Sequence, residues 1–157
     1  MKILVISSNL IGDNILSSGV LQHFLNIYSN SRFTIITGPT SSQLYDYFPN
    51  LEKRIIIQKK KFNLHWIKIL NSCLLKKWDI VIDFRSSLIS YVLNNKKKYI
   101  FKKNNRFHHI QQLNNLFNFD CSNLKIYNAS NEVETVNNKI NKNYIYIVIC
   151  PGGNWSP

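Results

Sequence analysis

Short apolar runs alternate along the chain with longer stretches in which apolar residues recur every three or four positions. The short runs predict strands that are covered on both faces, at 3–6, 32–37, 54–58, 79–84, 99–101 and 145–149. The longer stretches predict helices at 11–28, 41–48, 64–75, 87–93 and 108–117. Such alternation is typical of βαβ units. The expected fold class is therefore α/β, with a Rossmann-like, doubly wound parallel sheet.

The pattern changes near the end of the chain. Residues 121–143 are rich in Asn, Lys and Ser and predict a connecting stretch, with a frayed helix near 132–140. The run at 145–149 predicts one more strand, and Pro151-Gly152-Gly153 follows it. A glycine-bearing loop after such a strand normally leads into a helix whose first amides face a phosphate. We therefore expect a domain at 1–143 and the truncated start of a second domain at 144–157.

Composition narrows the class of protein. The 157 residues are 45% hydrophobic, which suits one globular domain and excludes a fully disordered chain. No apolar run approaches the ~18 residues of a membrane helix, and no signal peptide is apparent, so we expect a cytoplasmic protein. Cys73, Cys121 and Cys150 form neither a disulfide ladder nor a metal-ligand spacing, and are expected to be reduced, mostly packed thiols.

The net charge is +12, and most of the cations are lysines that occur in runs such as Lys96-Lys97-Lys98. Such a charge favours nucleic acid, an anionic membrane face or a phosphorylated substrate as partner. The abundance of Asn, Ile and Lys, all with A/T-rich codons, explains much of the charge without any partner. Because there is no Cys/His finger and no strand with aromatic residues between basic ones, we do not expect nucleic-acid binding.

The first candidate site follows the first predicted strand, at 7–14. Ligands of parallel sheets bind outside the carboxyl ends of the strands, which places Asp13 at the crevice. Asp13 suits two roles: a cap for the following helix, or a general base that removes a proton from a hydroxyl group. Gly12 would let the chain turn tightly and approach a ligand. The segment is neither a GxGxxG fingerprint nor a P-loop.

The second candidate site follows the strand at 79–84. Arg85 suits a carboxylate or a phosphate, while Ser86 and Ser87 suit either ligand contact or capping of the next helix. Asp83, inside the buried run, is expected to be a structural hydrogen-bond partner. His108 and His109 point in different directions on a helix and lack a further ligand, so no metal site is expected. Contact of one histidine with a bound anion or acceptor is one interpretation, and a solvated or capping histidine is the other.

Four segments, in order, resemble the ADP-heptose:lipopolysaccharide heptosyltransferases of glycosyltransferase family 9. MKILVISSNLIGDNILSS resembles their first strand and Gly-Asp turn, and RFTIITGPTSSQLYDYFPNLEKRIII resembles their second strand and Asn-Pro-x-Ile-Asp region. WDIVIDFRSSLISYVL resembles their Tyr-Asp-x-Val-Ile-Asp-Leu-Gln-Gly segment. YIYIVICPGGNWSP resembles the strand that opens their C-terminal domain, with Cys150 in place of the usual His.

The resemblance implies a fold, a site and partners. It covers the N-terminal half of a two-domain GT-B transferase, whose N-terminal domain receives the acceptor sugar. Asp13 then matches the catalytic base. Acceptor-binding positions would be Gly12, Asn14, Arg85, Ser86 and Ser87, although Arg85-Ser86 replaces the family's Gln-Gly. Gly152 and Gly153 would meet the phosphates of a nucleotide-diphosphate sugar such as ADP-heptose, without a metal or other cofactor.

The activity implied is inverting sugar transfer to a lipid-linked acceptor sugar in lipopolysaccharide core synthesis. The expected partners are that acceptor, the anionic inner face of the cytoplasmic membrane and a separately encoded C-terminal half, because a truncated chain would be inactive alone. The alternative is a non-catalytic α/β domain that binds an acceptor or a protein. Half of a dinucleotide-dependent oxidoreductase is a further alternative, which the missing glycine fingerprint disfavours.

Overall fold

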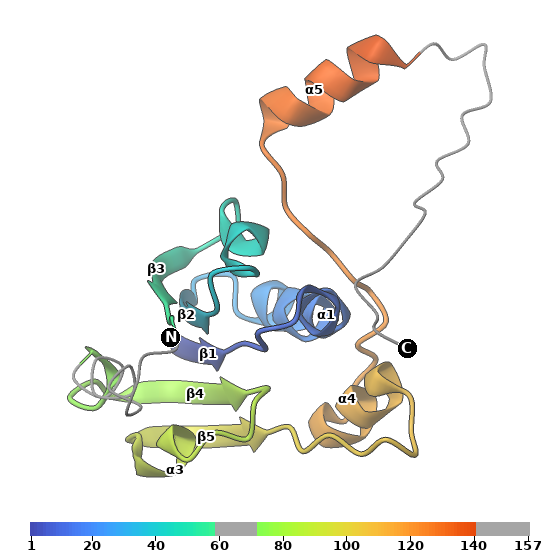
Figure 1. Ribbon diagram of the computed structural model, residues 1–157. Helices are drawn as coiled ribbons and strands as arrows, with labels where there is room; N and C mark the ends of the chain where they lie inside the picture. Colours follow the sequence, from blue (N-terminus) through green and yellow to red (C-terminus); the bar gives the residue numbers. More distant parts are fainter. Residues whose placement is uncertain (59–71, 141–157) are drawn as a thin grey trace. The chain divides into compact units, whose positions relative to one another are not determined.

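The computed structural model describes residues 1–58 and 72–140, and within them the chain forms a parallel sheet (Figure 1). The strand order is β3-β2-β1-β4-β5. The strands are β1 (Lys2–Ile6), β2 (Arg32–Thr37), β3 (Leu51–Ile56), β4 (Trp78–Asp83) and β5 (Asn95–Ile100). Every neighbouring pair is parallel. The predicted α/β class and parallel sheet are confirmed, while the strand expected at 145–149 lies outside the described residues.

The helices differ more from the predicted ranges than the strands do. They are α1 (Ile11–Ile27), η1 (Ser42–Tyr45), α3 (Ile89–Val92), α4 (His109–Phe117) and α5 (Ser130–Lys139). The helix expected at 41–48 is a single 3-10 turn, and the one at 87–93 is a four-residue helix. Most of the helix predicted at 64–75 falls among residues that are not described.

Both outer strands begin earlier than the sequence predicts. β3 starts at Leu51 instead of residue 54, and β5 starts at Asn95 instead of residue 99. The reason is that outer strands need no continuous apolar run, and lysine stems can lie over apolar neighbours. In β5 the Nζ atom of Lys97 lies 5.0 Å from the ring centre of Tyr99.

Hydrophobic clusters cover both faces of the sheet, as expected for a doubly wound arrangement. Because successive side chains of a strand point to opposite faces, Ile3 and Val5 belong to one cluster and Leu4 and Ile6 to the other. The first cluster is completed by apolar side chains of α1 and α4, including Val20, Leu21, Phe24, Leu113 and Phe117. The second includes Cys73, Trp78, Ile89 and Leu93.

The polar stretch after α4 lies across α1. The backbone passes so close that a Cβ atom on Gly19 would lie 1.9 Å from the carbonyl oxygen of Cys121. Further along, the amide of Lys125 donates a hydrogen bond of 3.0 Å to Ser18 Oγ, and Tyr127 donates one to Gln22. The first part of the predicted connecting stretch, residues 121–127, therefore packs against α1 and belongs to the sheet domain.

The chain divides into two compact units, residues 1–127 and 128–157. The second contains α5, which confirms the helix expected near 132–140 and exposes Val133 and Val136. A domain boundary at 143 stays a prediction. Among the described helices, none combines the length and the apolar character that crossing a membrane requires.

Burial raises the pKa of both cysteines that the structure describes. Cys73 and Cys121 are unpaired and buried, and burial raises the pKa of the Cys121 thiol to about 11. The pKa of Cys73 is also raised by burial. The prediction of packed, reduced thiols is confirmed for both, and Cys150 lies outside the described residues.

Candidate active site at the carboxyl edge of the sheet

The carboxyl ends of the strands meet at one edge of the sheet (Figure 1). Backbone hydrogen bonds fix this alignment: Phe84 N donates to Ile6 O at 2.9 Å, and Phe101 N donates to Asp83 O at 2.8 Å. β1 and β4 are neighbours although two strands separate them in sequence. Strand order reverses between them, which is where ligands of open α/β sheets bind.

Asp13 lies at this reversal point, in the first turn of α1. Asp13 is half-buried, and Ser8 Oγ donates a hydrogen bond of 3.2 Å to its Oδ2 atom. The same Ser8 oxygen accepts a bond of 3.2 Å from the amide of Leu10. Leu10 occupies the N-cap position without a capping hydrogen bond from its side chain, so Asp13 lies in the first turn and not at the N-cap itself. The carboxylate is instead held by one hydroxyl in the first turn, where the helix dipole favours negative charge.

Asn14 braces the turn that carries Asp13. It is 2% exposed, and its Nδ2 donates bonds of 2.8 Å to the carbonyl oxygens of Ser8 and Leu10. Its Oδ1 accepts a bond of 3.0 Å from the hydroxyl of Tyr45. Burial raises the pKa of Tyr45 to about 12, so this phenol remains a donor at neutral pH. Asn14 is thus placed to hold the loop and has little surface left for an acceptor.

Gly12 is exposed in the first turn of α1. A Cβ atom there would meet nothing within 4 Å, and the residue does not adopt a positive φ. The tight-turn interpretation of Gly12 is therefore wrong. What its position does provide is open space beside Asp13.

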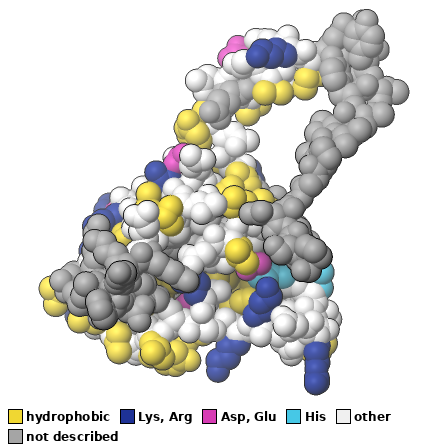
Figure 2. Space-filling model, viewed as in Figure 1, with side chains coloured by type: hydrophobic (Ala, Val, Ile, Leu, Met, Phe, Trp, Pro, Cys, Tyr) yellow, Lys and Arg dark blue, Asp and Glu magenta, His cyan; other side chains and the backbone are white. Residues whose placement is uncertain are grey.

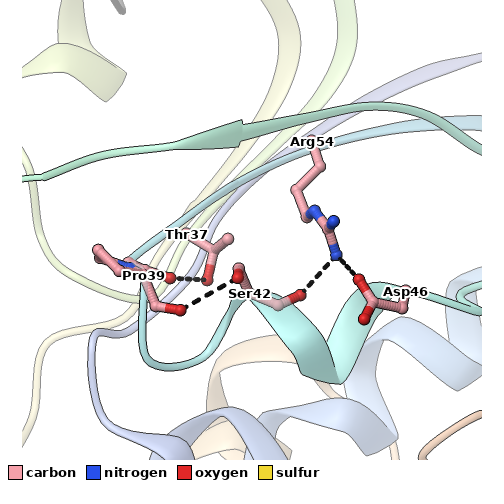
Figure 3. A network of polar contacts seen from close by, with 6 residues as sticks. Thr37, Pro39, Ser42, Asp46 and Arg54 are labelled. Atoms are coloured by element: carbon pink, nitrogen blue, oxygen red, sulfur yellow. Dashed lines mark hydrogen bonds and ion pairs between the residues drawn. The ribbon is translucent and has the colours of Figure 1, made fainter.

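The loop after β2 lies next to the Asp13 turn and is stabilised by polar contacts (Figure 3). Arg54 on β3 donates a bond of 2.8 Å to the carbonyl of Ser42 and forms an ion pair with Asp46. Ser42 Oγ in turn donates a bond of 3.0 Å to Pro39 O. Ser41 links this loop to the Asp13 turn, because its Oγ donates a bond of 3.3 Å to Ser8 O.

The exit of β4 carries the second predicted site. Asp83 is fully buried and accepts three bonds: 2.8 Å from Arg85 N, 2.7 Å from Ser87 N and 2.7 Å from Ser87 Oγ. Its predicted structural role is confirmed. Ser87 is buried in this cluster, while the half-buried Arg85 lies in the turn.

Ser86 is exposed and has a φ of 51°. Its Oγ donates a bond of 2.7 Å to Phe101 O, which ties the turn to the end of β5. The N-cap of α3 is Leu88, without a capping side chain, so the capping interpretation of Ser86 and Ser87 is wrong. Backbone strain of this kind in a non-glycine residue is concentrated at functional sites.

His109, the first residue of α4, lies near Ser17 and Asp13, whereas the sequence suggested only that one of the two histidines could contact an acceptor, without indicating which. Its Nε2 lies 3.4 Å from Ser17 Oγ, and its ring centre lies 4.8 Å from that of Phe101. Burial lowers the pKa of His109, and the nearby Asp13 carboxylate partly opposes that shift. The sequence does indicate that His109 lies near the carboxyl edge of the sheet, because the helix predicted at 108–117 begins soon after the end of a predicted strand. His108 is exposed and forms no capping hydrogen bond.

Within the described ranges, no group of three His, Cys, Asp or Glu side chains could hold a metal ion. Gly152 and Gly153 lie outside the described residues. The arrangement thus combines a half-buried carboxylate, an adjacent hydroxyl and a half-buried imidazole at the carboxyl edge of the sheet. Such a set can accept a proton from a hydroxyl group and orient it.

The comparisons with known proteins concern the fold. No protein-family model matches the chain, and no curated protein sequence matches it. The solved structures with a similar fold include the following three. Escherichia coli heptosyltransferase WaaC with ADP-2-deoxy-2-fluoro heptose has a TM-score of 0.58 at 12% identity, over 80% of this chain and 51% of that chain. The family 9 glycosyl transferase from Veillonella parvula has a TM-score of 0.57 at 20% identity, over 87% and 48%.

The third is E. coli ADP-heptose LPS heptosyltransferase II, with a TM-score of 0.54 at 12% identity, over 88% of this chain and 50% of that chain. The chain therefore spans about half the length of these transferases. At these identities the likeness concerns the fold, and at that level it confirms the predicted resemblance to heptosyltransferases of family 9.

Proposed function

We propose that this chain is the acceptor-side half of a family 9 glycosyltransferase and that Asp13 is its catalytic base. The observation that carries the proposal is the placement of Asp13. It is half-buried at the β1–β4 reversal point, with Ser8 as hydrogen-bond donor and open space beside Gly12. The similarity of fold to heptosyltransferases supports the same reaction class.

The reaction is inverting transfer from a nucleotide-diphosphate sugar to a sugar hydroxyl. Asp13 takes the hydroxyl proton while the acceptor oxygen bonds to the anomeric carbon of the donor. The bond from that carbon to the diphosphate oxygen breaks on the opposite face, and the diphosphate leaves with the electron pair. Removal of a proton by a positioned base contributes about 10²–10⁴-fold to such a rate.

The acceptor would lie along the neighbouring strand exits. Arg85 and Ser86 at the β4 exit are the proposed acceptor contacts, because Arg85 is half-buried and Ser86 is exposed, whereas Asn14 and Ser87 are buried. The proposed acceptor is a sugar linked to a lipid, which places the chain at the inner face of the cytoplasmic membrane. The diphosphate needs stabilising amides or cations, for which Gly152 and Gly153 are proposed.

The donor would be ADP-heptose or a close analogue, since the WaaC structure carries ADP-2-deoxy-2-fluoro heptose. Because the chain spans about half of each relative, we propose that transfer requires a C-terminal half like theirs. The alternative is an α/β domain that binds an acceptor or a protein without catalysis.

The test is to mix this chain with the C-terminal domain of a heptosyltransferase and measure sugar transfer from ADP-heptose to a lipopolysaccharide core acceptor. We expect transfer by the mixture and none by either part alone. Acceptor binding without any transfer by the mixture would favour the non-catalytic alternative. Robust transfer by this chain alone would overturn the proposed need for a second half.

A further inference from the structure

Helix α3 has two apolar faces. Ile89 and Leu93 point into the core and are 5% and 4% exposed. Leu88, Tyr91 and Val92 are 86%, 55% and 59% exposed. Their spacing of three and four residues places them on one face of the helical turn. Figure 2 shows hydrophobic side chains at the surface over α3, along the lower edge of the molecule.

Cations adjoin this apolar face. β5 follows α3 and forms the edge of the described sheet, with Lys96, Lys97 and Lys98 exposed. The Nζ atom of Lys98 lies 4.7 Å from the ring centre of Tyr91. Lys96 pairs with Asp79 at 2.6 Å, so Lys98 supplies the charge nearest the apolar side chains. We call Leu88, Tyr91, Val92 and Lys98 the α3 face.

Simpler explanations account for only part of this surface. Lysines on an edge strand discourage pairing with other chains, and single exposed apolar residues are common. Neither reason explains three outward apolar side chains on one helical turn, with a lysine over the aromatic ring. An apolar face that includes an aromatic ring and is bordered by lysines suits the boundary between headgroups and acyl chains. The net charge of +12 complements anionic headgroups.

The α3 face also borders the candidate site. Leu88 follows Ser87 directly, so the apolar face begins where the β4 exit turn ends. A bilayer against α3 would therefore lie close to the β4 exit turn.

We propose that the α3 face is a membrane-binding surface, inserted into an anionic bilayer with Leu88, Tyr91 and Val92 among the acyl chains and Lys98 at the phosphates. The inference rests on the proposed function only for its lipid-linked acceptor. The contact itself requires neither acceptor sugar nor donor.

The test is co-sedimentation of the full chain with vesicles of phosphatidylethanolamine and phosphatidylglycerol, and with vesicles of phosphatidylcholine alone. We expect binding to the first kind only, weakened by high salt. L88Q/V92Q should weaken binding about tenfold or more, because two apolar side chains lose their burial. K98Q should weaken it about fivefold, since one lysine near an anionic surface contributes about that factor.

The matched control is I27Q/Y47Q, which changes two residues that are 56% and 51% exposed on other elements. It should bind like the wild type, and circular dichroism should be unchanged in every variant. The proposal is overturned if the wild type ignores anionic vesicles, or if L88Q/V92Q binds as well as the control. It is also overturned if L88Q/V92Q only abolishes self-association in size-exclusion chromatography, because the face would then bind a second copy. Since these vesicles contain no acceptor sugar, a failure here is distinct from a failure of sugar transfer.

Discussion

Two aspartates at neighbouring strand exits differ in burial and in hydrogen-bond partners. Asp83 ends β4, is fully buried and accepts three hydrogen bonds from the turn that follows. Asp13 lies beyond the end of β1, is half-buried and accepts a bond from the Ser8 hydroxyl. A carboxylate whose oxygens are occupied by the protein organises a turn, whereas a partly exposed carboxylate keeps surface that a ligand can reach. The same residue type at two strand exits therefore has different surroundings, and the different roles proposed for the two aspartates rest on that difference.

The largest expected effect separates these two aspartates by stability. D83A should lower the free energy of unfolding by about 3 kcal/mol or more, because two amides and a hydroxyl lose a buried charged acceptor. D13A should change it by less than about 1 kcal/mol. Urea denaturation of both variants measures the difference, and equal losses would contradict the division of roles.

The next effect concerns the brace beneath Asp13. Y45F removes the donor to Asn14 and should cost about 1–2 kcal/mol of stability, since a buried amide oxygen is left unpaired. Y47F is the matched control, because Tyr47 is 51% exposed, and it should cost almost nothing. If thermal unfolding finds the two variants alike, Asn14 does not depend on Tyr45.

A smaller effect follows from the histidine beside Asp13. Burial lowers the pKa of His109 below its ordinary 6.5, so the unfolded chain binds more protons than the folded one as pH falls through about 6.5. His109 therefore stabilises the fold less as the solution becomes more acidic. H109Q should lose less stability than the wild type between pH 7 and pH 5.

The same histidine reports on Asp13. Because the Asp13 carboxylate raises the pKa of His109 against burial, D13N should lower that pKa further. NMR titration of the imidazole measures this shift. An unchanged or higher value would mean that the two groups do not face each other.

The smallest effect is at Gly12. G12A should leave stability unchanged or raise it by up to about 1 kcal/mol, because alanine favours a helix and the added Cβ meets nothing within 4 Å. G19A is the contrasting variant on the same helix and should be strongly destabilising, since its Cβ would overlap the carbonyl of Cys121. Comparable thermal stability of the two variants would contradict this account of α1.

The sequence was sufficient to predict the inner strands and α1. Burial on both faces gives the inner strands continuous apolar runs such as Ile3–Ile6, and α1 has apolar residues at helical spacing. The sequence did not predict where β3 and β5 begin. These outer strands tolerate lysine, so they contain no continuous apolar run that marks their first residues. The structural role of Asp83 was predictable, since it ends a buried run.

The composition of the site was less predictable. The bond between Asn14 and Tyr45 joins residues 31 positions apart, and the placement of His109 depends on the packing of α4 against α1. The spacing of apolar residues along a sequence does not indicate which distant side chains form hydrogen bonds with each other. The turn at Ser86 was also missed, because serine gives no signal of a positive φ.

The central claim is that the Asp13 carboxylate, and not Asp83, acts on the acceptor. The most direct measurement is the rate of sugar transfer by the chain mixed with a heptosyltransferase C-terminal domain, comparing wild type with D13N. We expect D13N to fold normally, to keep its affinity for the acceptor and to lose about 100-fold or more in rate. Wild-type transfer rates in a folded D13N variant would contradict the claim.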